Sequence, residues 1–160
     1  MAEFTHFNDE GRAWMVDVSA KPATERVARA AATVYLNRET FNMVAEGRAK
    51  KGDVLAVAQV AGIMAAKKTG DIIPMCHPLA LHGVDISFEL DGEAYTIKII
   101  STARCRGETG VEMEAMTAAA VAALTVYDMC KAVQRDILIG DVMLLYKSGG
   151  KSGEFIREEM

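Results

Sequence analysis

The sequence predicts an α+β fold: a ferredoxin-like split βαβ sandwich with a four-stranded antiparallel sheet, two long helices on one face and a short extra helix. The predicted elements follow the order strand, helix, strand, strand, helix, strand, with the short helix inserted early. The two middle strands meet at Asp91-Gly92, a dipeptide typical of tight hairpins. A chain of 160 residues suits a single domain, 1–160, and its glycine-rich last part, 148–160, is expected to be a flexible tail.

Three elements are predicted before the hairpin. Residues 25–36 alternate apolar and polar side chains, which indicates a strand, although the alanines leave a helix possible. Residues 39–47 have the pattern of a short helix closed by Gly47. Residues 52–70 are apolar nearly all the way round, with Asp53 as an N-terminal cap, which predicts a long buried helix.

The remaining elements follow the same reasoning. The hairpin strands are predicted at 81–90 and 93–105, where apolar and polar residues alternate. Residues 112–134 predict the second long helix, and residues 141–147 predict a last strand. Neither long helix has a polar stripe for its outer side, so we expect another chain to cover these faces. The alternative is that exposed alanine needs no cover.

The composition is that of a globular protein and excludes several classes of function. Apolar residues make up 51% of the chain and charged residues 25%, so disorder is excluded as the main state. The formal net charge of -4 argues against general nucleic-acid binding, which needs a surplus of Lys and Arg on one face. The absence of a signal-like start, of a membrane-length apolar run and of closely spaced cysteines leads us to expect a cytoplasmic protein with reduced thiols.

Residues 74–78, Pro-Met-Cys-His-Pro, place a cysteine and a histidine side by side between two prolines. Adjacent Cys76 and His77 cannot easily share one tetrahedral ion, and no other His or Cys has a matching spacing, so no metal site is expected. A catalytic dyad is also disfavoured, because neighbouring side chains in an extended loop point apart. The prolines stiffen the backbone, so His77 is interpreted as a donor aimed at a ligand, with an ordinary surface histidine as the alternative.

Asp128 and Lys131 are three residues apart on the last helix and therefore project from one face. In a dry pocket such a pair can exchange protons and serve as acid and base. A surface salt bridge is the alternative, but the surrounding segment is otherwise apolar, which favours a position at a cleft or an interface.

Two glutamates stand near the start of the same helix. Glu112 has the capping-box spacing from Thr109. Glu114 precedes Asp128 by fourteen residues, which corresponds to about 21 Å along a helix axis. One small substrate cannot touch both side chains in the same chain, so a site that uses both must lie between subunits.

Lysines mark two further segments as anion-binding candidates. The segment 148–153, Ser-Gly-Gly-Lys-Ser-Gly, lacks the first glycine and the following helix of a phosphate-binding loop. Lys147 and Lys151 could still close over an anionic ligand as a mobile flap, with a frayed terminus as the alternative. Lys50 and Lys51 precede the first long helix, where a phosphate would meet positive charge and free N–H groups, although adjacent lysines are usually only solvated.

Five segments carry a specific resemblance: MVDVSAK, KKGDVLAVAQVAGIMAAKKT, IPMCHPLAL, TGVEMEAMTAAAVAALTVYDMCKAV and KSGGKSG. In this order, over about residues 15–153, the chain resembles the MoaC family of molybdenum cofactor biosynthesis. The resemblance implies an enzyme that converts 3',8-cyclo-7,8-dihydroguanosine 5'-triphosphate, made by a separate radical-SAM cyclase, to cyclic pyranopterin monophosphate with release of pyrophosphate. It implies no redox cofactor, with Mg²⁺ conceivable on the triphosphate, and a homohexamer built as a trimer of dimers with active sites between subunits.

By position, the resemblance implies that Asp128 is catalytic and that Lys131 and Lys51 are its partners. The residues expected to bind substrate, from the resemblance and from the arguments above, are Met75, Cys76, His77, Glu112, Met113, Glu114, Lys147 and Lys151. Glu108 departs from the family pattern, so no phosphate contact is expected of it. The alternative function is a non-catalytic oligomeric scaffold that binds a nucleotide or a partner protein, with the charged residues serving assembly.

Overall fold

The computed structural model describes residues 6–47 and 52–158, and Lys50 and Lys51 lie outside this part of the chain. Within it, five strands and four helices follow one another. They are β1 (Thr24–Tyr35), α1 (Arg38–Ala45), α2 (Val54–Ala66), α3 (Thr69–Ile72), β2 (Leu81–Asp91), β3 (Thr96–Gly107), α4 (Glu112–Cys130), β4 (Leu138–Ser148) and β5 (Phe155–Ile156).

The strands form one antiparallel sheet in the order β2-β3-β1-β4-β5. The prediction of four strands is wrong, because the chain turns back after Ser148 and Phe155 and Ile156 pair with Lys147 and Tyr146. A fifth strand therefore forms inside the segment that was expected to be a flexible tail. The α+β class is confirmed, and the order of β1 to β4 does not conflict with a ferredoxin-like arrangement.

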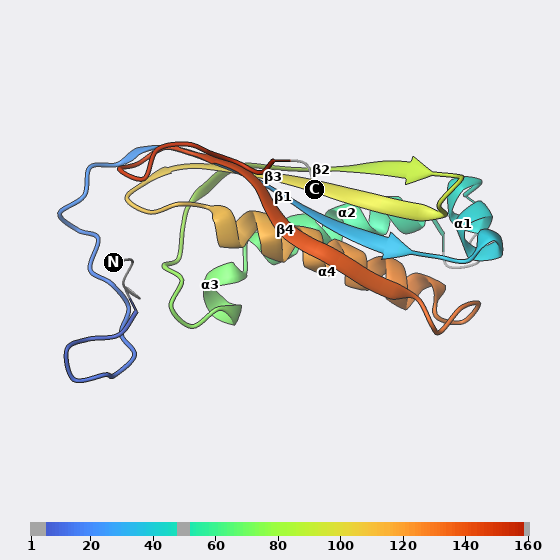
Figure 1. Cartoon of the computed structure of the whole chain (residues 1–160), viewed down its shortest axis with the longest axis horizontal. Coiled ribbons are helices and arrows are strands. Elements are labelled where there is room, and N and C mark those ends of the chain that lie inside the picture. Colours follow the sequence, from blue (N-terminus) through green and yellow to red (C-terminus); the bar gives the residue numbers. More distant parts are fainter. Residues whose placement is uncertain (1–5, 48–51, 159–160) are drawn as a thin grey trace.

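The long helices α2 and α4 lie on the same face of the sheet and pack against each other (Figure 1). Small residues allow this close contact. A Cβ atom on Gly62 would lie 2.9 Å from the carbonyl oxygen of Ala118 and closer still to the Cδ1 atom of Ile86. Five alanines of α4 have no exposed surface: Ala115, Ala118, Ala119, Ala122 and Ala123. The alanine-rich helix is therefore core, placed close to the sheet because its side chains are short.

The segment 52–70, predicted as one helix, forms α2 and the short α3. The predicted cap is confirmed, since the Oδ1 atom of Asp53 accepts a hydrogen bond from the N–H of Ala56 at 3.0 Å. α2 ends at Ala66, whose carbonyl oxygen accepts a hydrogen bond from the Oγ1 atom of Thr69 at 3.0 Å. A side chain thus satisfies a carbonyl at the end of α2, and the chain starts a new turn at Thr69.

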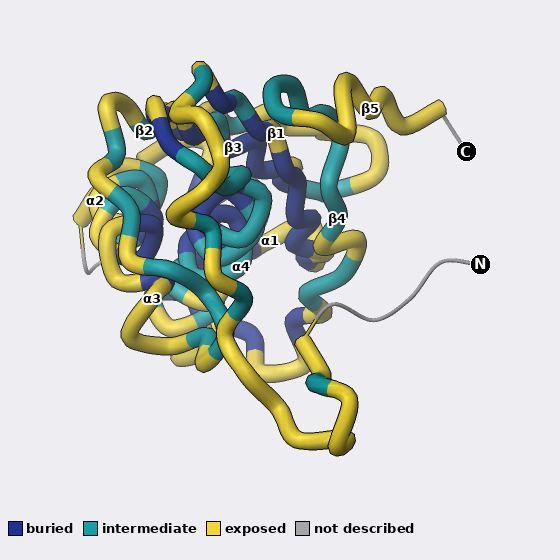
Figure 2. The backbone as a smooth tube through the Cα atoms, turned by 90° about the vertical axis from the view of Figure 1, so that its left-hand side faces the viewer, coloured by how far each residue is buried: buried dark blue, intermediate teal, exposed yellow. Residues whose placement is uncertain are grey.

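An N-terminal arm, residues 6–23, runs beyond the end of the sheet (Figure 1) and is exposed along most of its length (Figure 2). The arm exposes large apolar side chains, among them Phe7 at 57% and Trp14 at 44%. The large exposed apolar side chains of the two long helices are Val57, Val60, Met64 and Leu124. Across residues 6–47 and 52–158, no helix combines the length and the apolar character needed to cross a membrane.

Candidate active site

Two adjoining pockets lie at the start of α4, with volumes of about 570 and 360 Å³. They share Lys21, Thr109, Gly110 and Glu112. We call the larger one the basic pocket; besides the shared residues, its lining includes Arg26, Glu108, Lys147, Gly149, Gly150, Lys151 and Ser152. We call the smaller one the loop pocket; besides the shared residues, its lining includes His6, Val16, Val18, Met75, Cys76, His77, Leu79, Met113 and Glu114.

The loop pocket brings together two sets of residues that the sequence singled out separately. Residues 75–77 of the proline-flanked loop lie opposite residues 112–114 at the start of α4. About thirty-five residues and two strands separate these segments in the chain. The fold therefore gathers six of the eight residues expected to bind substrate in one pocket, and their roles there stay predictions.

His77 is held in one orientation by the N-terminal arm. Its Nε2 atom lies 2.7 Å from the carbonyl oxygen of Val16. Because a carbonyl oxygen can only accept, Nε2 carries the proton of this bond, and Nδ1 is the ring nitrogen left for another partner. The interpretation of His77 as an aimed side chain gains a physical basis, although the group that aims it was not predicted.

The backbone of the loop around His77 is also held by contacts with Gly70 of α3 and with Ile73. Pro78 packs on Gly70 of α3, where an added Cβ atom would lie 3.3 Å from the Cα atom of Pro78. The N–H of Cys76 donates to the carbonyl oxygen of Ile73 at 3.1 Å. A turn, a packed proline and the bond to the arm thus fix the loop at three points.

The acid and the thiol of the loop pocket are both shifted toward their neutral forms. Glu114 exposes only 4% of its surface, and this burial raises its pKa, a shift that the nearby charge of Glu112 increases and a bond to its own backbone N–H opposes. Burial, and then the charge of Glu114, raises the pKa of the Cys76 thiol. Cys76 is therefore a protonated thiol at neutral pH, which argues against a thiolate nucleophile.

The capping box predicted between Thr109 and Glu112 is wrong. Val111 occupies the N-cap position of α4, and no side chain caps this end. The Glu112 carboxylate instead lies against Gly110, where an added Cβ atom would lie 2.7 Å from its carboxyl carbon. Glycine at position 110 leaves room for Glu112 to face the pockets.

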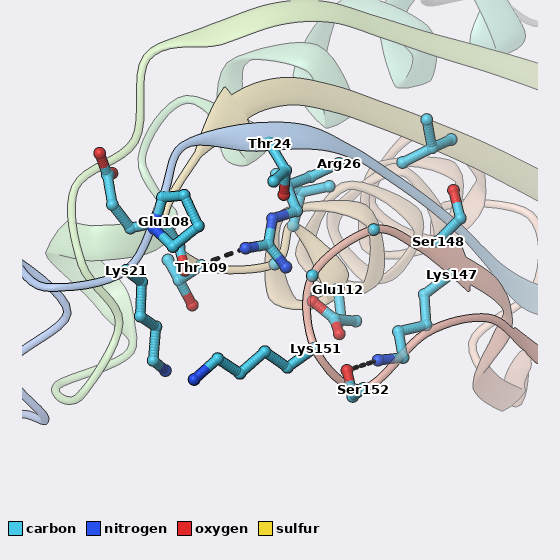
Figure 3. A pocket seen from close by; sticks show the side chains of 16 residues that line it. Lys21, Thr24, Arg26, Glu108, Thr109, Glu112, Lys147, Ser148, Lys151 and Ser152 are labelled. Atoms are coloured by element: carbon cyan, nitrogen blue, oxygen red, sulfur yellow. Dashed lines mark hydrogen bonds between the residues drawn. The ribbon is translucent and has the colours of Figure 1, made fainter.

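The basic pocket contains more cations than carboxylates. Four cationic side chains line it, Lys21, Arg26, Lys147 and Lys151, against the two carboxylates of Glu108 and Glu112. Figure 3 shows Lys21 and Lys151 extending toward each other, while the Nζ atom of Lys147 donates to the Oγ atom of Ser152. The glycine-rich segment therefore lies over a pocket whose charge suits an anion.

Asp128 and Lys131 lie at the opposite end of α4 from both pockets. The Nζ atom of Lys131 donates to the Oδ1 atom of Asp128 at 2.6 Å, which confirms that they share a helix face. Their side chains are 59% and 52% exposed, and the hydrogen bond to Asp128, followed by its charge, raises the pKa of Lys131. A single chain does not bring this pair to the residues of the loop pocket.

Among the residues that line or orient the pockets without having been predicted from the sequence, three are Lys21, Arg26 and Val16. Lys21 lines both pockets, Arg26 lines the basic pocket from β1, and the backbone of Val16 orients His77. Lys21 belongs to the MVDVSAK segment, whose resemblance was the only available signal for it. Lys51, predicted as a catalytic partner, lies outside the described residues. Among residues 6–47 and 52–158, no group of three or more His, Cys, Asp or Glu side chains has a metal-binding arrangement.

The fold and the pockets define an α+β protein with a cation-lined pocket beside a second pocket that contains titratable side chains. The model of the MoaC family matches residues 15–150, and the chain belongs to that family. Relatives named cyclic pyranopterin monophosphate synthase include proteins of Peptoclostridium acidaminophilum and Geobacillus kaustophilus, each 58% identical over 99% of both chains. The relative of the same name from Thermoanaerobacter pseudethanolicus is 60% identical over 96% of this chain and 98% of its own.

Proposed function

We propose that this chain is a cyclic pyranopterin monophosphate synthase, a lyase of molybdenum cofactor biosynthesis. It converts 3',8-cyclo-7,8-dihydroguanosine 5'-triphosphate to cyclic pyranopterin monophosphate and pyrophosphate. The observation that carries the proposal is the near full-length similarity, 58–60% identical, to proteins of that name. The paired pockets support it, because the substrate has a highly charged triphosphate and a neutral ring system that need different surroundings.

The basic pocket is the proposed place of the triphosphate and of the leaving pyrophosphate. Its three lysines and Arg26 supply the positive charge that a developing phosphate anion requires. The loop pocket is the proposed place of the guanine-derived rings. There Glu114, whose raised pKa favours the protonated acid, and His77, with one nitrogen already committed, offer hydrogen bonds to ring heteroatoms.

Asp128 and Lys131 are proposed to reach this substrate from a neighbouring subunit. The rearrangement opens the imidazole ring, closes the pyran ring and forms the cyclic phosphate, and each step moves protons at different atoms. Asp128 and Lys131 are proposed to exchange protons with the substrate, with Lys51 as a further proton donor or acceptor. The distance between the pockets and this pair along α4, about 21 Å, supports two chains contributing to each site.

The assembly proposed is a homohexamer made of three dimers, each subunit with a ferredoxin-like arrangement. The exposed apolar side chains of α2 and α4, such as Met64 at 61% and Leu124 at 57%, support burial against other copies. The enzyme receives its substrate from the radical-SAM cyclase that forms it. The absence of a redox cofactor, Mg²⁺ on the triphosphate and a cytoplasmic location stay predictions.

The direct test supplies the purified protein with the cyclic dihydroguanosine triphosphate and follows two products. Pyrophosphate release, measured by a coupled assay, and the cyclic monophosphate, measured by mass spectrometry, are expected to appear in equal amounts. A protein that binds the substrate in a stable oligomer without releasing pyrophosphate would instead be the non-catalytic scaffold.

A further inference from the structure

Arg26 of β1 is a buried cation whose fork of donors faces backbone. It exposes 8% of its surface, its Nε atom donates to the carbonyl oxygen of Gly107, and its Nη2 atom donates to that of Glu108, each at 3.1 Å. Arg26 forms no salt bridge with a carboxylate of the described residues. The guanidinium therefore holds the loop between β3 and α4 through two main-chain oxygens, which residues of any type at 107 and 108 could provide.

The glycine turn at the end of β4 rests on the other side of the same guanidinium. A Cβ atom on Gly150 would lie 2.7 Å from the Cζ atom of Arg26, 3.0 Å from Nη2 and closer still to Nη1. A Cβ atom on Gly149 would meet the Cδ atom of Arg26 at 3.1 Å and would overlap with the carbonyl oxygen of Glu25. Only a residue without a side chain allows the turn to approach Arg26 so closely.

This turn carries the two lysines of the C-terminal segment to the basic pocket. Lys147 precedes it and Lys151 follows it, and the bond from Lys147 to Ser152 closes it. Beyond the turn, Arg157 ties the returning chain to β4, with its N–H donating to the carbonyl oxygen of Leu145 at 2.8 Å. The turn is thus anchored by β5 at its far end and by Arg26 at its near end.

We infer that Arg26 and Gly150 form a joint that sets the distance between the lysine-bearing turn and the β3–α4 loop across the basic pocket. Arg26 is then a positioning residue, which acts through the backbone that it holds in addition to any charge that it supplies. The effect of the joint on phosphate binding rests on the proposed function. The coupling of the two segments by the joint is independent of that function.

The chain offers a matched pair of variants for this inference. Gly150 and Gly153 both have a left-handed backbone, with φ of 74° and 66°, so alanine introduces similar backbone strain at each. Only at Gly150 does the new Cβ atom meet Arg26, whereas nothing lies within 4 Å at Gly153. With inorganic pyrophosphate as the probe in calorimetry, Gly150→Ala is expected to weaken binding about tenfold more than Gly153→Ala.

Two further variants separate positioning from charge. Arg26→Lys keeps the charge but cannot reach both carbonyl oxygens, so it is expected to weaken pyrophosphate binding nearly as much as Arg26→Ala. In the Arg26→Ala background, Gly150→Ala has no guanidinium to displace and should add little. Wild-type affinity in Arg26→Lys, or full additivity in the double variant, would overturn the inference.

Amide hydrogen exchange tests the coupling without any ligand. Exchange at residues 107–111 is expected to speed up in Gly150→Ala and to stay at the wild-type rate in Gly153→Ala, because the displaced guanidinium releases the loop. Equal exchange in the two variants would overturn the joint. If the wild-type protein does not bind pyrophosphate but the exchange difference appears, the joint stands and the placement of the phosphates under the proposed function fails.

Discussion

The Nε2 atom of His77 lies 2.7 Å from the carbonyl oxygen of Val16, so the proline-flanked loop and the N-terminal arm hold each other in place. The bond serves both segments. It fixes which nitrogen of His77 carries a proton, and it ties an otherwise exposed arm to the wall of the loop pocket. An arm that carries Lys21 to both pockets is thereby positioned by a residue of the site itself.

Replacing His77 should therefore release the arm. His77→Ala loses the bond to Val16, whereas the side-chain amide of His77→Gln can still donate to the same carbonyl oxygen. Limited trypsin digestion after Arg12 is expected to proceed roughly fivefold faster in His77→Ala than in the wild type, and to change little in His77→Gln. Cleavage of His77→Ala at the wild-type rate would show that the arm is held by other contacts.

Asp128→Asn should abolish turnover without unfolding the protein. The pair with Lys131 is more than half exposed, so its loss should barely change thermal stability. If Asp128 is the base, turnover is expected to fall by roughly a hundredfold or more. Asp71→Asn is the matched control, since Asp71 forms the equivalent exposed pair with Lys68. Comparable turnover in the two variants, measured by pyrophosphate release, would remove Asp128 from the mechanism.

Glu114 should make the stability of the protein depend on pH. Its pKa is raised by burial, so the folded state favours the protonated acid, and this contribution is present below the usual value of 4.5 and is lost as the pH rises through the higher folded value. Glu114→Gln keeps a neutral side chain at every pH. The Tm of Glu114→Gln relative to the wild type is therefore expected to rise as the pH increases above 4.5 and then to level off.

The exposed Glu89 of β2 provides the control for this measurement. Glu89→Gln removes one carboxylate of the same chain without touching a buried charge, so its Tm difference should stay small across the same range. A Tm difference for Glu114→Gln that does not change with pH would mean that solvent reaches the carboxylate in the folded protein.

Most elements of the fold followed from local pattern, and the errors have physical causes. Alternation marked β1 to β3, and the cap at Asp53 marked the start of α2. The fifth strand was missed because Phe155 and Ile156 form only a two-residue strand, too short for any alternation to show. The last helix was also predicted too long, since α4 ends at Cys130 although apolar residues continue beyond it.

The candidate site, like the fold, was predicted from the sequence only in part. His77, Glu112 and Glu114 were singled out by local pattern, whereas Met75, Cys76 and Met113 were expected to bind substrate only from the family resemblance, and the fold brings all six together. Arg26 escaped notice because its bonds reach residues 81 and 82 positions away, a relation that no local pattern encodes. The capping box was predicted wrongly for a different reason. Thr109 and Glu112 have the right spacing for it, but Val111 and not Thr109 is the N-cap of α4.

The central claim is that each active site takes Glu114 and its pocket from one chain and Asp128 with Lys131 from another. Co-refolding Glu114→Ala with Asp128→Asn, each expected to be inactive alone, tests it, because half of randomly formed dimers are mixed and each mixed dimer contains one intact site. The mixture is predicted to regain about one quarter of wild-type pyrophosphate release. A mixture that stays as inactive as its two parents would place the whole site within a single chain.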